Sequence, residues 1–275
     1  MKFAVVTTYA DRHYEEFAKR CLETMAEFWP STIDLINLRD AGLANRSSWL
    51  PAFKRRHAHR PTSDYRMDAV RFAHKVAAID IAAQETAADV LIWIDADCIT
   101  HAPVTEAWLE SLLGDADFAY LRRQMKYPEC GFMLFRLNMR GRALINAIVD
   151  QYRHDLLFAL PEWHDSFVID RVREKLVSGG GLVDKSLSGN AEHTHHPLIN
   201  GPLGAKLDHL KGPRKSHGHS YGRDLKVTRT EAYWQEVKAA SRVLDVEKAK
   251  ASARRQAAKK AARHRALAQS NGSGQ

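Results

Sequence analysis

Two carboxylates that follow an apolar run are the residues of this sequence with the clearest chemical potential. Residues 90–94 are Val-Leu-Ile-Trp-Ile, and Asp95 and Asp97 come directly after them, separated by Ala96. A run of β-branched and aromatic residues with polar flanks predicts a buried strand. Side chains at i and i+2 of an extended chain point to the same side, so this pair can hold one cation. Parallel sheets bind ligands beyond the carboxyl ends of their strands, which is where the pair is expected.

A second group of candidate residues lies far downstream, within the segment 207–215. It consists of His209, Gly212 and Lys215, each three residues from the next. An imidazole together with carboxylates suits Mn²⁺, with Mg²⁺ as the alternative. Glycine lets the backbone approach a bound group closely, and a lysine ammonium can neutralise negative charge that develops beside it. Either motif alone could be a coincidence of surface residues, but their joint occurrence favours one shared site.

Both motifs resemble those of one enzyme family. Asp95-Ala96-Asp97 resembles the DxD motif of glycosyltransferases with the GT-A fold, and His209-x-x-Gly212-x-x-Lys215 resembles the C-terminal motif of their retaining, glycogenin-like family eight. The resemblance implies a metal held by Asp95, Asp97 and His209, and a UDP-sugar donor contacted by Ala96, Gly212 and Lys215. It also implies transfer with retention. The family motif continues with aromatic residues and a proline, where this chain has Ser216-His-Gly-His-Ser220, which leaves the acceptor open.

The end of the first predicted strand is expected to face the same donor. Thr7, Thr8 and Tyr9 stand there, and the matching segment of GT-A enzymes holds the nucleotide base. The alternative is a hydroxyl cluster that starts the next helix.

Two basic residues of a predicted helix are further donor candidates. Arg71 and Lys75 are four residues apart, so they share a helix face. Similar transferases carry a basic residue here that points at the sugar nucleotide. The alternative is a solvated face on which Asp68 pairs with Arg71.

Two acids are the candidate catalytic residues. Glu129 and Gly131 resemble a small-residue turn beside the donor sugar, where Gly131 would leave room for the sugar ring and Glu129 would bind its hydroxyls. Asp165 lies near the start of a predicted helix, where such transferases keep an acid that faces donor or acceptor. Asp165 acting as a base would imply inversion, and its alternative role is that of a helix-capping acid.

An α/β fold is predicted to position these residues. Hydrophobic periodicity predicts strands at 4–8, 33–38, 90–94, 118–121 and 131–136, and helices at 11–28, 64–84, 106–113, 140–154 and 164–176. The alternation of strands and helices predicts a mostly parallel, Rossmann-like sheet flanked by helices, as in GT-A enzymes. Residues 41–62 look irregular, and 185–223 are expected to form an ordered active-site loop region.

Composition limits the class of protein. The chain has 275 residues, 45% of them hydrophobic, which is enough for one sizeable domain with an appendage. Its three cysteines lack metal-ligand spacing and indicate reduced thiols in a cytoplasmic protein. No apolar run is long enough to span a membrane, and the apolar start is too short for a signal peptide.

The positive charge is concentrated at the end of the chain. The formal net charge is +8, and the residues after Glu247 include eight lysines and arginines but no acid. We therefore predict a catalytic domain at 1–229 and a basic helical extension with a disordered end at 230–275. Residues 248–265 and the basic cluster at 54–60 are candidate DNA contacts, with salt-sensitive affinity. The alternatives for the tail are a solvated helix or contact with anionic lipid.

These features together predict a metal-dependent glycosyltransferase. The segment 208–212, followed by Arg214 and Lys215, also resembles phage-type transferases that glycosylate hydroxymethylated bases, so DNA is the leading acceptor. The alternatives are transfer to a polysaccharide, a lipid-linked sugar or a protein. A nucleotidyltransferase would want a Gly-rich phosphate loop, which residues 7–12 lack, and a non-catalytic nucleic-acid-binding protein would not explain the metal residues.

Overall fold

A six-stranded sheet forms the centre of the molecule in the computed structural model, which describes residues 1–60, 62–124, 126–212, 214–231 and 233–235. The strand order is β2-β1-β3-β6-β5-β7. The strands are β1 (Phe3–Tyr9), β2 (Asp34–Arg39), β3 (Val90–Ile94), β5 (Phe118–Arg123), β6 (Lys126–Arg136) and β7 (Asp184–Ser186). Only β6 runs against its neighbours β3 and β5, while the other pairs are parallel. The predicted mostly parallel α/β sheet is confirmed.

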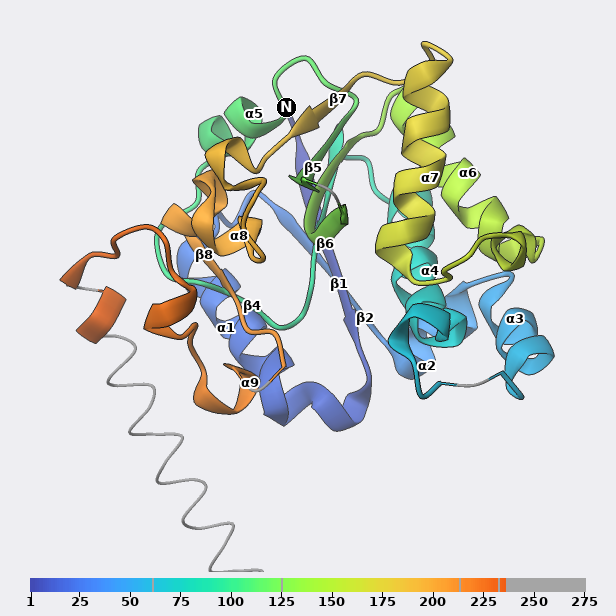
Figure 1. Ribbon diagram of the computed structural model, residues 1–275, viewed down its shortest axis with the longest axis horizontal. Helices are drawn as coiled ribbons and strands as arrows, with labels where there is room; N and C mark the ends of the chain where they lie inside the picture. Colours follow the sequence, from blue (N-terminus) through green and yellow to red (C-terminus); the bar gives the residue numbers. More distant parts are fainter. Residues whose placement is uncertain (61, 125, 213, 232, 236–275) are drawn as a thin grey trace, which may run out of the picture.

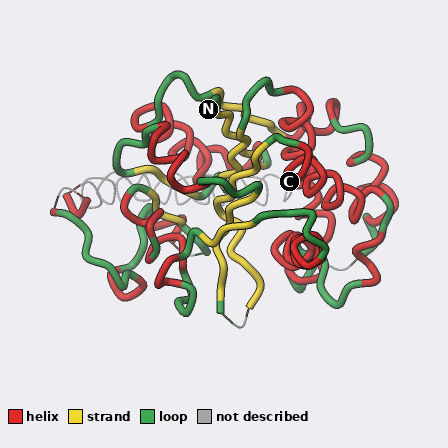
Figure 2. The backbone as a smooth tube through the Cα atoms, turned by 90° about the horizontal axis from the view of Figure 1, so that it is seen from above, coloured by secondary structure: helices red, strands yellow, loops and turns green. Residues whose placement is uncertain are grey.

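Helices cover both faces of this sheet (Figures 1 and 2). They are α1 (Lys19–Phe28), α2 (Asp40–Arg46), α3 (Leu50–His57), α4 (Ala69–Glu85), α5 (Glu106–Leu113), α6 (Met139–Arg153), α7 (Asp165–Ser178), α8 (Pro197–Asn200) and α9 (Arg214–His217). No helix in the described ranges is long and apolar enough to cross a membrane.

The strand β3 shows how the sequence builds two cores. All five of its residues are buried. Leu91 and Trp93 pack into the core that contains side chains of α3, α4, α6 and α7. Ile92 and Ile94 pack into the other core, with side chains of α1 and α5. Because strand side chains alternate between faces, a strand covered on both sides must be continuously apolar, as residues 90–94 are.

A second, two-stranded sheet brings the two sequence motifs together. The strand β4 (Cys98–Thr100) pairs antiparallel with β8 (Leu207–His209), and Cys98 stands opposite His209. Neither short strand was predicted from the sequence. Their pairing fixes the distance between the DxD turn and the histidine motif.

The prediction that residues 41–62 are irregular is wrong, because this segment contains most of α2 and all of α3. Leu43, Leu50 and Phe53 are buried in the core beside α4. The Ser47 hydroxyl accepts a hydrogen bond from the Leu50 amide at 3.0 Å, and the Trp49 indole donates to Asp80 at 2.9 Å. Packing on α4 therefore orders a segment whose residue types favour a loop.

Two predicted helices also begin later than their patterns indicate. The helix expected at 11–28 starts as a 3₁₀ turn and a π turn, and α1 proper begins at Lys19. The helix expected at 64–84 begins at Ala69, because the Asp68 carboxylate caps it by accepting from the Arg71 amide at 3.1 Å. Most of the predicted extension at 230–275, including the basic residues 248–265, lies outside the described residues.

Candidate functional site

The two aspartates lie in a tight turn between β3 and β4. The Asp95 amide donates to the Gly131 carbonyl at 2.9 Å, and the Cys98 amide donates to the Asp95 carbonyl at the same distance. The Trp93 indole donates to the Asp95 carboxylate at 2.8 Å. The Asp97 carbonyl accepts from the Leu210 amide at 2.8 Å, which ties the turn to the chain after β8. Both carboxylates are therefore held in place by backbone on either side.

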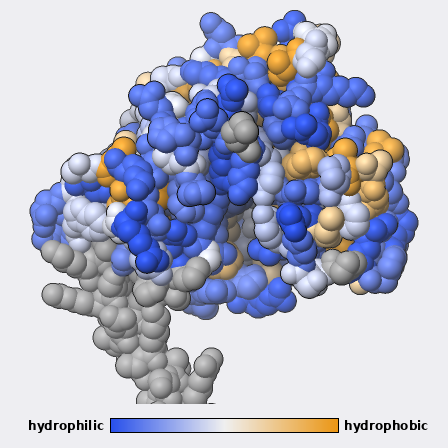
Figure 3. All heavy atoms as spheres, in the orientation of Figure 1, coloured by the Kyte–Doolittle hydropathy of each residue, from blue (hydrophilic) through white to orange (hydrophobic). Residues whose placement is uncertain are grey.

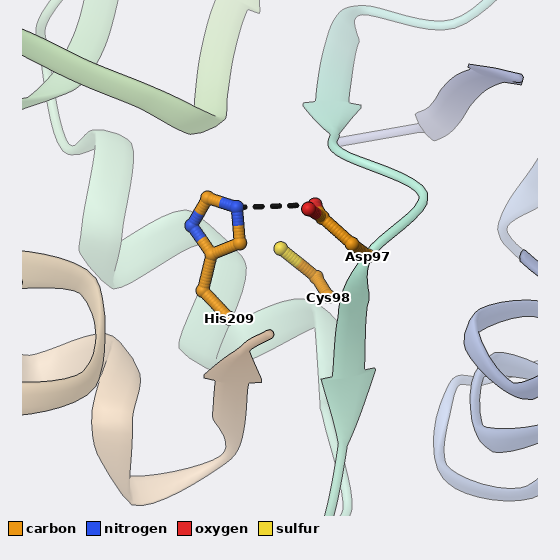
Figure 4. A group of neighbouring side chains, drawn as sticks. All are labelled: Asp97, Cys98 and His209. Carbon is orange, nitrogen blue, oxygen red and sulfur yellow. Dashed lines mark hydrogen bonds and ion pairs between the residues drawn. The ribbon is translucent and has the colours of Figure 1, made fainter. Parts of the chain in front are cut away.

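His209 reaches this turn from β8. Its Nε2 lies 3.1 Å from Asp97 Oδ1 and 3.6 Å from Asp95 Oδ2. Figure 4 shows the imidazole ring pointing toward the Asp97 carboxylate, with the Cys98 side chain beside it. The sequence motifs that predicted these three residues as one site therefore lie together.

Glu129 orients the histidine from the other side of the ring. Its Oε1 lies 2.9 Å from His209 Nδ1 and 2.5 Å from the Lys211 ammonium, and its Oε2 lies 3.4 Å from Arg123. Burial alone raises the pKa of a carboxyl group, but Lys211 and His209 hold the pKa of Glu129 well below its usual range. An ionised carboxylate that fixes the ring orientation is the usual outer partner of a metal-binding histidine. The ion pair of Lys211 with Glu129 was not predicted from the sequence.

The donor atoms around His209 fit a divalent cation. Ligand atoms of Asp97, Cys98 and His209 lie within 4.8 Å of one another. Burial raises the pKa of the Cys98 thiol well above its usual value, and the neighbouring aspartates raise it further. Thiolate is also a soft ligand, whereas Mg²⁺ and Mn²⁺ prefer oxygen and nitrogen donors. With Nδ1 engaged by Glu129, the Nε2 atom and the carboxylates of Asp95 and Asp97 are the available donors. This nitrogen and oxygen set suits Mn²⁺ or Mg²⁺.

Lys75 holds two acids together at the edge of this site. Its ammonium lies 2.8 Å from Asp95 Oδ1 and 2.5 Å from Asp165 Oδ2, and it donates to the Cys130 carbonyl at 2.9 Å. Burial raises the pKa of a carboxyl such as Asp165, but the Lys75 charge outweighs it and lowers that pKa. Asp165, the first residue of α7, is thus an ion-paired anion in a buried position.

Lys215 and Gly212 complete the wall on the α9 side. The Lys215 ammonium lies 3.0 Å from Asp97 Oδ2 and 4.2 Å from the centre of the Phe17 ring. Gly212 has φ of +57°, a conformation that other residues adopt at a cost, and no atom lies within 4 Å of the position a Cβ would take. The turn requires glycine, and it leaves the backbone open on that side.

The absence of a side chain at Gly131 leaves room for the His209 ring. A Cβ at this position would lie 2.5 Å from Cε1 and 2.6 Å from Nδ1 of His209. The space that the sequence suggested for a sugar ring is therefore filled by the imidazole.

Two cavities meet at this group of residues. One, of about 1250 Å³, is lined by Lys75, Asp95, Asp97, Glu129, Gly131, Asp165, His209, Gly212 and Lys215, among others. The other, of about 590 Å³, is lined by Thr8, Tyr9 and Ala96 together with Lys75, Asp95, Asp97 and Lys215. Arg71 lines both.

The three residues at the end of β1 differ in their exposure to the smaller cavity. Thr8 donates to the Leu38 carbonyl at 2.5 Å, and the Tyr9 hydroxyl accepts from Asn37 at 3.0 Å, so both are fixed against β2. Thr7 lines neither cavity and is fully buried. Two of the three residues predicted to hold a base therefore face open space.

The basic cluster at 54–60 is partly engaged within the protein. Arg56 forms an ion pair with Asp155 at 2.9 Å, and the Arg60 guanidinium lies 3.6 Å from the centre of the Phe158 ring. These contacts attach α3 and the residues that follow it to the segment after α6. A contact between this cluster and DNA stays a prediction.

No protein-family model and no curated protein matches the chain. Among solved structures, similar ones include mouse xyloside xylosyltransferase 1, with a TM-score of 0.44 and 13% identity over 68% of this chain and 86% of that one. The glycosyltransferase GlyE of Streptococcus pneumoniae has a TM-score of 0.46 and 14% identity, over 91% of this chain and 64% of that one. A glycosyltransferase involved in glycosylation of the major capsid of PBCV-1 has a TM-score of 0.49 and 7% identity, over 79% and 98%. Structural similarity at this level does not define an activity, so a function must be argued from the geometry of the site.

Proposed function

We propose that the protein is a metal-dependent glycosyltransferase that moves a sugar from a nucleoside diphosphate donor, a UDP-sugar, to an acceptor hydroxyl. The observation that carries the proposal is the convergence of two distant motifs at one cavity wall. The β4–β8 pair sets His209 Nε2 at 3.1 Å from Asp97, and Lys215 lies 3.0 Å from the other Asp97 oxygen. Carboxylates, an imidazole and a lysine beside an open glycine backbone form a site for a metal-bound diphosphate.

Each group has a role in this proposal. Asp95, Asp97 and His209 would hold Mn²⁺ or Mg²⁺, which supplies Lewis acidity to the diphosphate when bound. Lys215 would neutralise the charge that develops on the leaving nucleoside diphosphate, and the Gly212 backbone would approach it closely. The smaller cavity, with Thr8 and Tyr9 in its wall, would take the nucleotide base, and Arg71 stands where the two cavities meet.

We infer retention of the anomeric configuration. Inversion would need a base to activate the acceptor hydroxyl, and an efficient base has a pKa near the working pH. Asp165 is ion-paired with Lys75, and Glu129 with Lys211 and His209, and the pKa of each acid is lowered. We therefore assign both acids positioning roles. NMR of the product anomer tests this, and an inverted product that disappears in Asp165→Asn would identify Asp165 as the base.

The direct test of the activity is incubation with a panel of sugar nucleotides and Mn²⁺, with release of the free nucleoside diphosphate as the readout. Asp97→Ala and His209→Ala should each lower the rate by at least about 100-fold, because loss of an outer partner of a metal ligand alone costs about 10–100-fold. Asp115→Ala, which removes an exposed carboxylate outside the site, is the matched control. Absence of release with every donor would end the proposal, and full activity of the two site variants would move the site elsewhere.

For the acceptor, we propose a hydroxymethylated base in DNA. The motif likeness and the basic tail support it. Transfer of labelled sugar to hydroxymethylated DNA, compared with unmodified DNA of the same sequence, tests it. Labelling of neither substrate would favour the polysaccharide, lipid-linked or protein acceptors. Equal labelling of the two would overturn the hydroxymethyl group as the acceptor.

A further inference from the structure

The large cavity has an excess of positive charge. Its lining includes eight lysines and arginines but five aspartates and glutamates, an excess of three positive charges when the histidines are neutral. Residues 1–247 of the chain, in contrast, are formally neutral, since the whole net charge of +8 equals the eight basic residues that follow Glu247. The imbalance is therefore a property of this cavity and does not reflect a generally basic surface.

The donor and its metal do not use this excess. The diphosphate of a sugar nucleotide has two negative charges, and a divalent cation has two positive ones, so together they add no net charge. The excess positive charge of the cavity is therefore available to a ligand other than the donor and its metal.

The excess resides at the rim of the cavity. The five acids in the lining are all ion-paired within the wall, as described for the metal site and as Asp224 is with Arg214 at 2.6 Å. Four exposed cations of the lining have no acidic partner within 4.0 Å among the described residues: Arg71, Lys126, Arg223 and Lys226. Arg71 also lines the smaller cavity, which is assigned to the donor, so Lys126, Arg223 and Lys226 remain. Hydrophilic residues predominate over the centre of the face in Figure 3, where the β5–β6 hairpin lies.

Both walls that present these cations are ordered by their own contacts. Arg223 and Lys226 belong to a loop that Asn200 clamps. The Asn200 amide group donates to the Asp224 carbonyl at 3.0 Å, and its oxygen accepts from the Lys226 amide at 2.6 Å. Lys126 opens β6 beside Tyr127, whose hydroxyl lies 2.6 Å from that of Tyr65. The order exists before a ligand binds, so little of the binding energy is lost to ordering the rim.

We propose that the acceptor is anionic, and that phosphate or carboxylate groups near its reacting hydroxyl bind Lys126, Arg223 and Lys226. This inference rests on the proposed glycosyltransferase function, because only in a transferase is the anionic ligand an acceptor. Charges that face each other across a site raise both the association rate and the selectivity among ligands. A neutral acceptor would leave three unpaired cations beside the reaction centre.

The test is a binding titration with the donor site saturated by UDP and Mn²⁺. The probes are glucose, glucose 6-phosphate, glucuronic acid and a short single-stranded oligonucleotide. We expect the charged probes to bind and glucose not to bind. The triple variant Lys126→Gln, Arg223→Gln, Lys226→Gln should weaken the charged probes by about tenfold. The matched control is Lys2→Gln, Arg140→Gln, Lys175→Gln, which removes the same charge from exposed positions that line none of the described cavities.

The outcomes separate the proposal of an anionic acceptor from the proposal of glycosyltransferase activity. Equal binding of glucose and glucose 6-phosphate, no binding of any charged probe, or the same loss in both triple variants would overturn an anionic acceptor. The comparison of probes counts only the binding that the triple variant weakens, because the basic residues after Glu247 can bind an oligonucleotide independently. By that measure, preference for the oligonucleotide over glucuronic acid would identify the source of the anions as a nucleic acid, and the reverse as an acidic sugar. Mn²⁺-dependent release of UDP from the donor, measured on the same protein, fails only if the glycosyltransferase proposal fails.

Discussion

At the scale of single residues, Lys75 decides the electrostatics of the acidic side of the site. Its ammonium is buried and contacts both Asp95 and Asp165. Burial lowers the pKa of a lysine, but the two carboxylates outweigh burial and raise the pKa of Lys75. The positive charge therefore persists at all physiological pH values and keeps two buried anions compatible.

Removal of the Lys75 ammonium should lower the free energy of unfolding, and the size of the loss should depend on which of its carboxylate partners are present. Lys75→Met leaves two acids without their cation, and loss of one partner of a buried pair costs about 3–5 kcal/mol of the free energy of unfolding. In an Asp165→Asn background the same change should cost less, because one of the two charges is already absent. Urea unfolding of the four proteins measures both costs. Identical costs in the two backgrounds would show that the Lys75–Asp165 contact contributes nothing to stability.

Asp155 offers a pH-dependent test of stability away from the candidate site. It accepts from Arg56 and His57 and has φ of +60°, which asparagine also tolerates. Asp155→Asn therefore removes the charge and keeps the backbone. Burial raises the pKa of Asp155, but Arg56 and His57 outweigh it and lower that pKa below the reference of 3.8.

A lowered carboxyl pKa means that the ion pair stabilises the fold above the unfolded pKa and that this stabilisation disappears as the pH falls through the folded one. Because the pair is partly exposed, we expect a loss in Asp155→Asn below about 1 kcal/mol near neutral pH. The difference from the unsubstituted protein should shrink below about pH 4. Urea unfolding over this pH range measures it, and a difference that grows on acidification would contradict the assignment.

At the scale of elements, the β4–β8 pair is itself held by contacts on the side away from the candidate metal site. Asp208, next to His209, is fully buried and accepts a hydrogen bond from the Tyr233 hydroxyl, while Arg229 lies 3.5 Å away. The described end of the chain is thereby attached to the strand that presents the histidine.

Tyr233→Phe should loosen this attachment. It removes a hydrogen bond from a buried carboxylate, which costs about 1–3 kcal/mol of the free energy of unfolding. Because Asp208 and His209 are neighbours on β8, Mn²⁺ affinity should fall as well. Unfolding and calorimetric Mn²⁺ titration measure the two effects. Tyr120→Phe is the matched control, since the Tyr120 hydroxyl makes no hydrogen bond with the described residues. Unchanged Mn²⁺ affinity would show that β8 is held without Tyr233.

The elements also show which features the sequence could predict. Residues 90–94 are apolar throughout because both sheet faces are covered, so β3 and the carboxylates at its end were predictable. The strands β4 and β8 have three residues each, too few for periodicity to appear. The helices α2 and α3 were missed because Gly42 and Pro51 favour a loop, while packing against α4 determines their structure.

The candidate site was predictable in its residues but not in their pairings. Asp95, Asp97 and His209 were found from motif spacing, and the structure brings them together. The contact of Glu129 with His209 depends on the approach of β6 to β8, which spacing along the chain does not encode. The contact of Lys211 with Glu129 had no signal either, because β8 ends at His209 and the Lys211 amide donates to the His209 carbonyl at 3.0 Å in a tight turn.

At the scale of the whole molecule, the charge divides into a neutral body and a basic tail. Deletion of residues 248–275 removes eight positive charges and no acid, so the net charge falls from +8 to zero. We expect weaker binding to double-stranded DNA and a flatter dependence on salt, by about 0.9 in the logarithmic slope for each phosphate that the tail no longer neutralises. Release of UDP from the donor should not change. A salt slope equal to that of the full chain would exclude the tail as the DNA contact.

The close approach of Gly131 to His209 has an evolutionary consequence. Any side chain at position 131 would overlap the imidazole, so a lineage that keeps the histidine must also keep the glycine. A lineage that loses the histidine is released from that requirement, and larger residues can then enter the strand. The two positions should therefore covary among descendants of this protein, and an intact glycine beside a substituted histidine would mark a recent loss of the site.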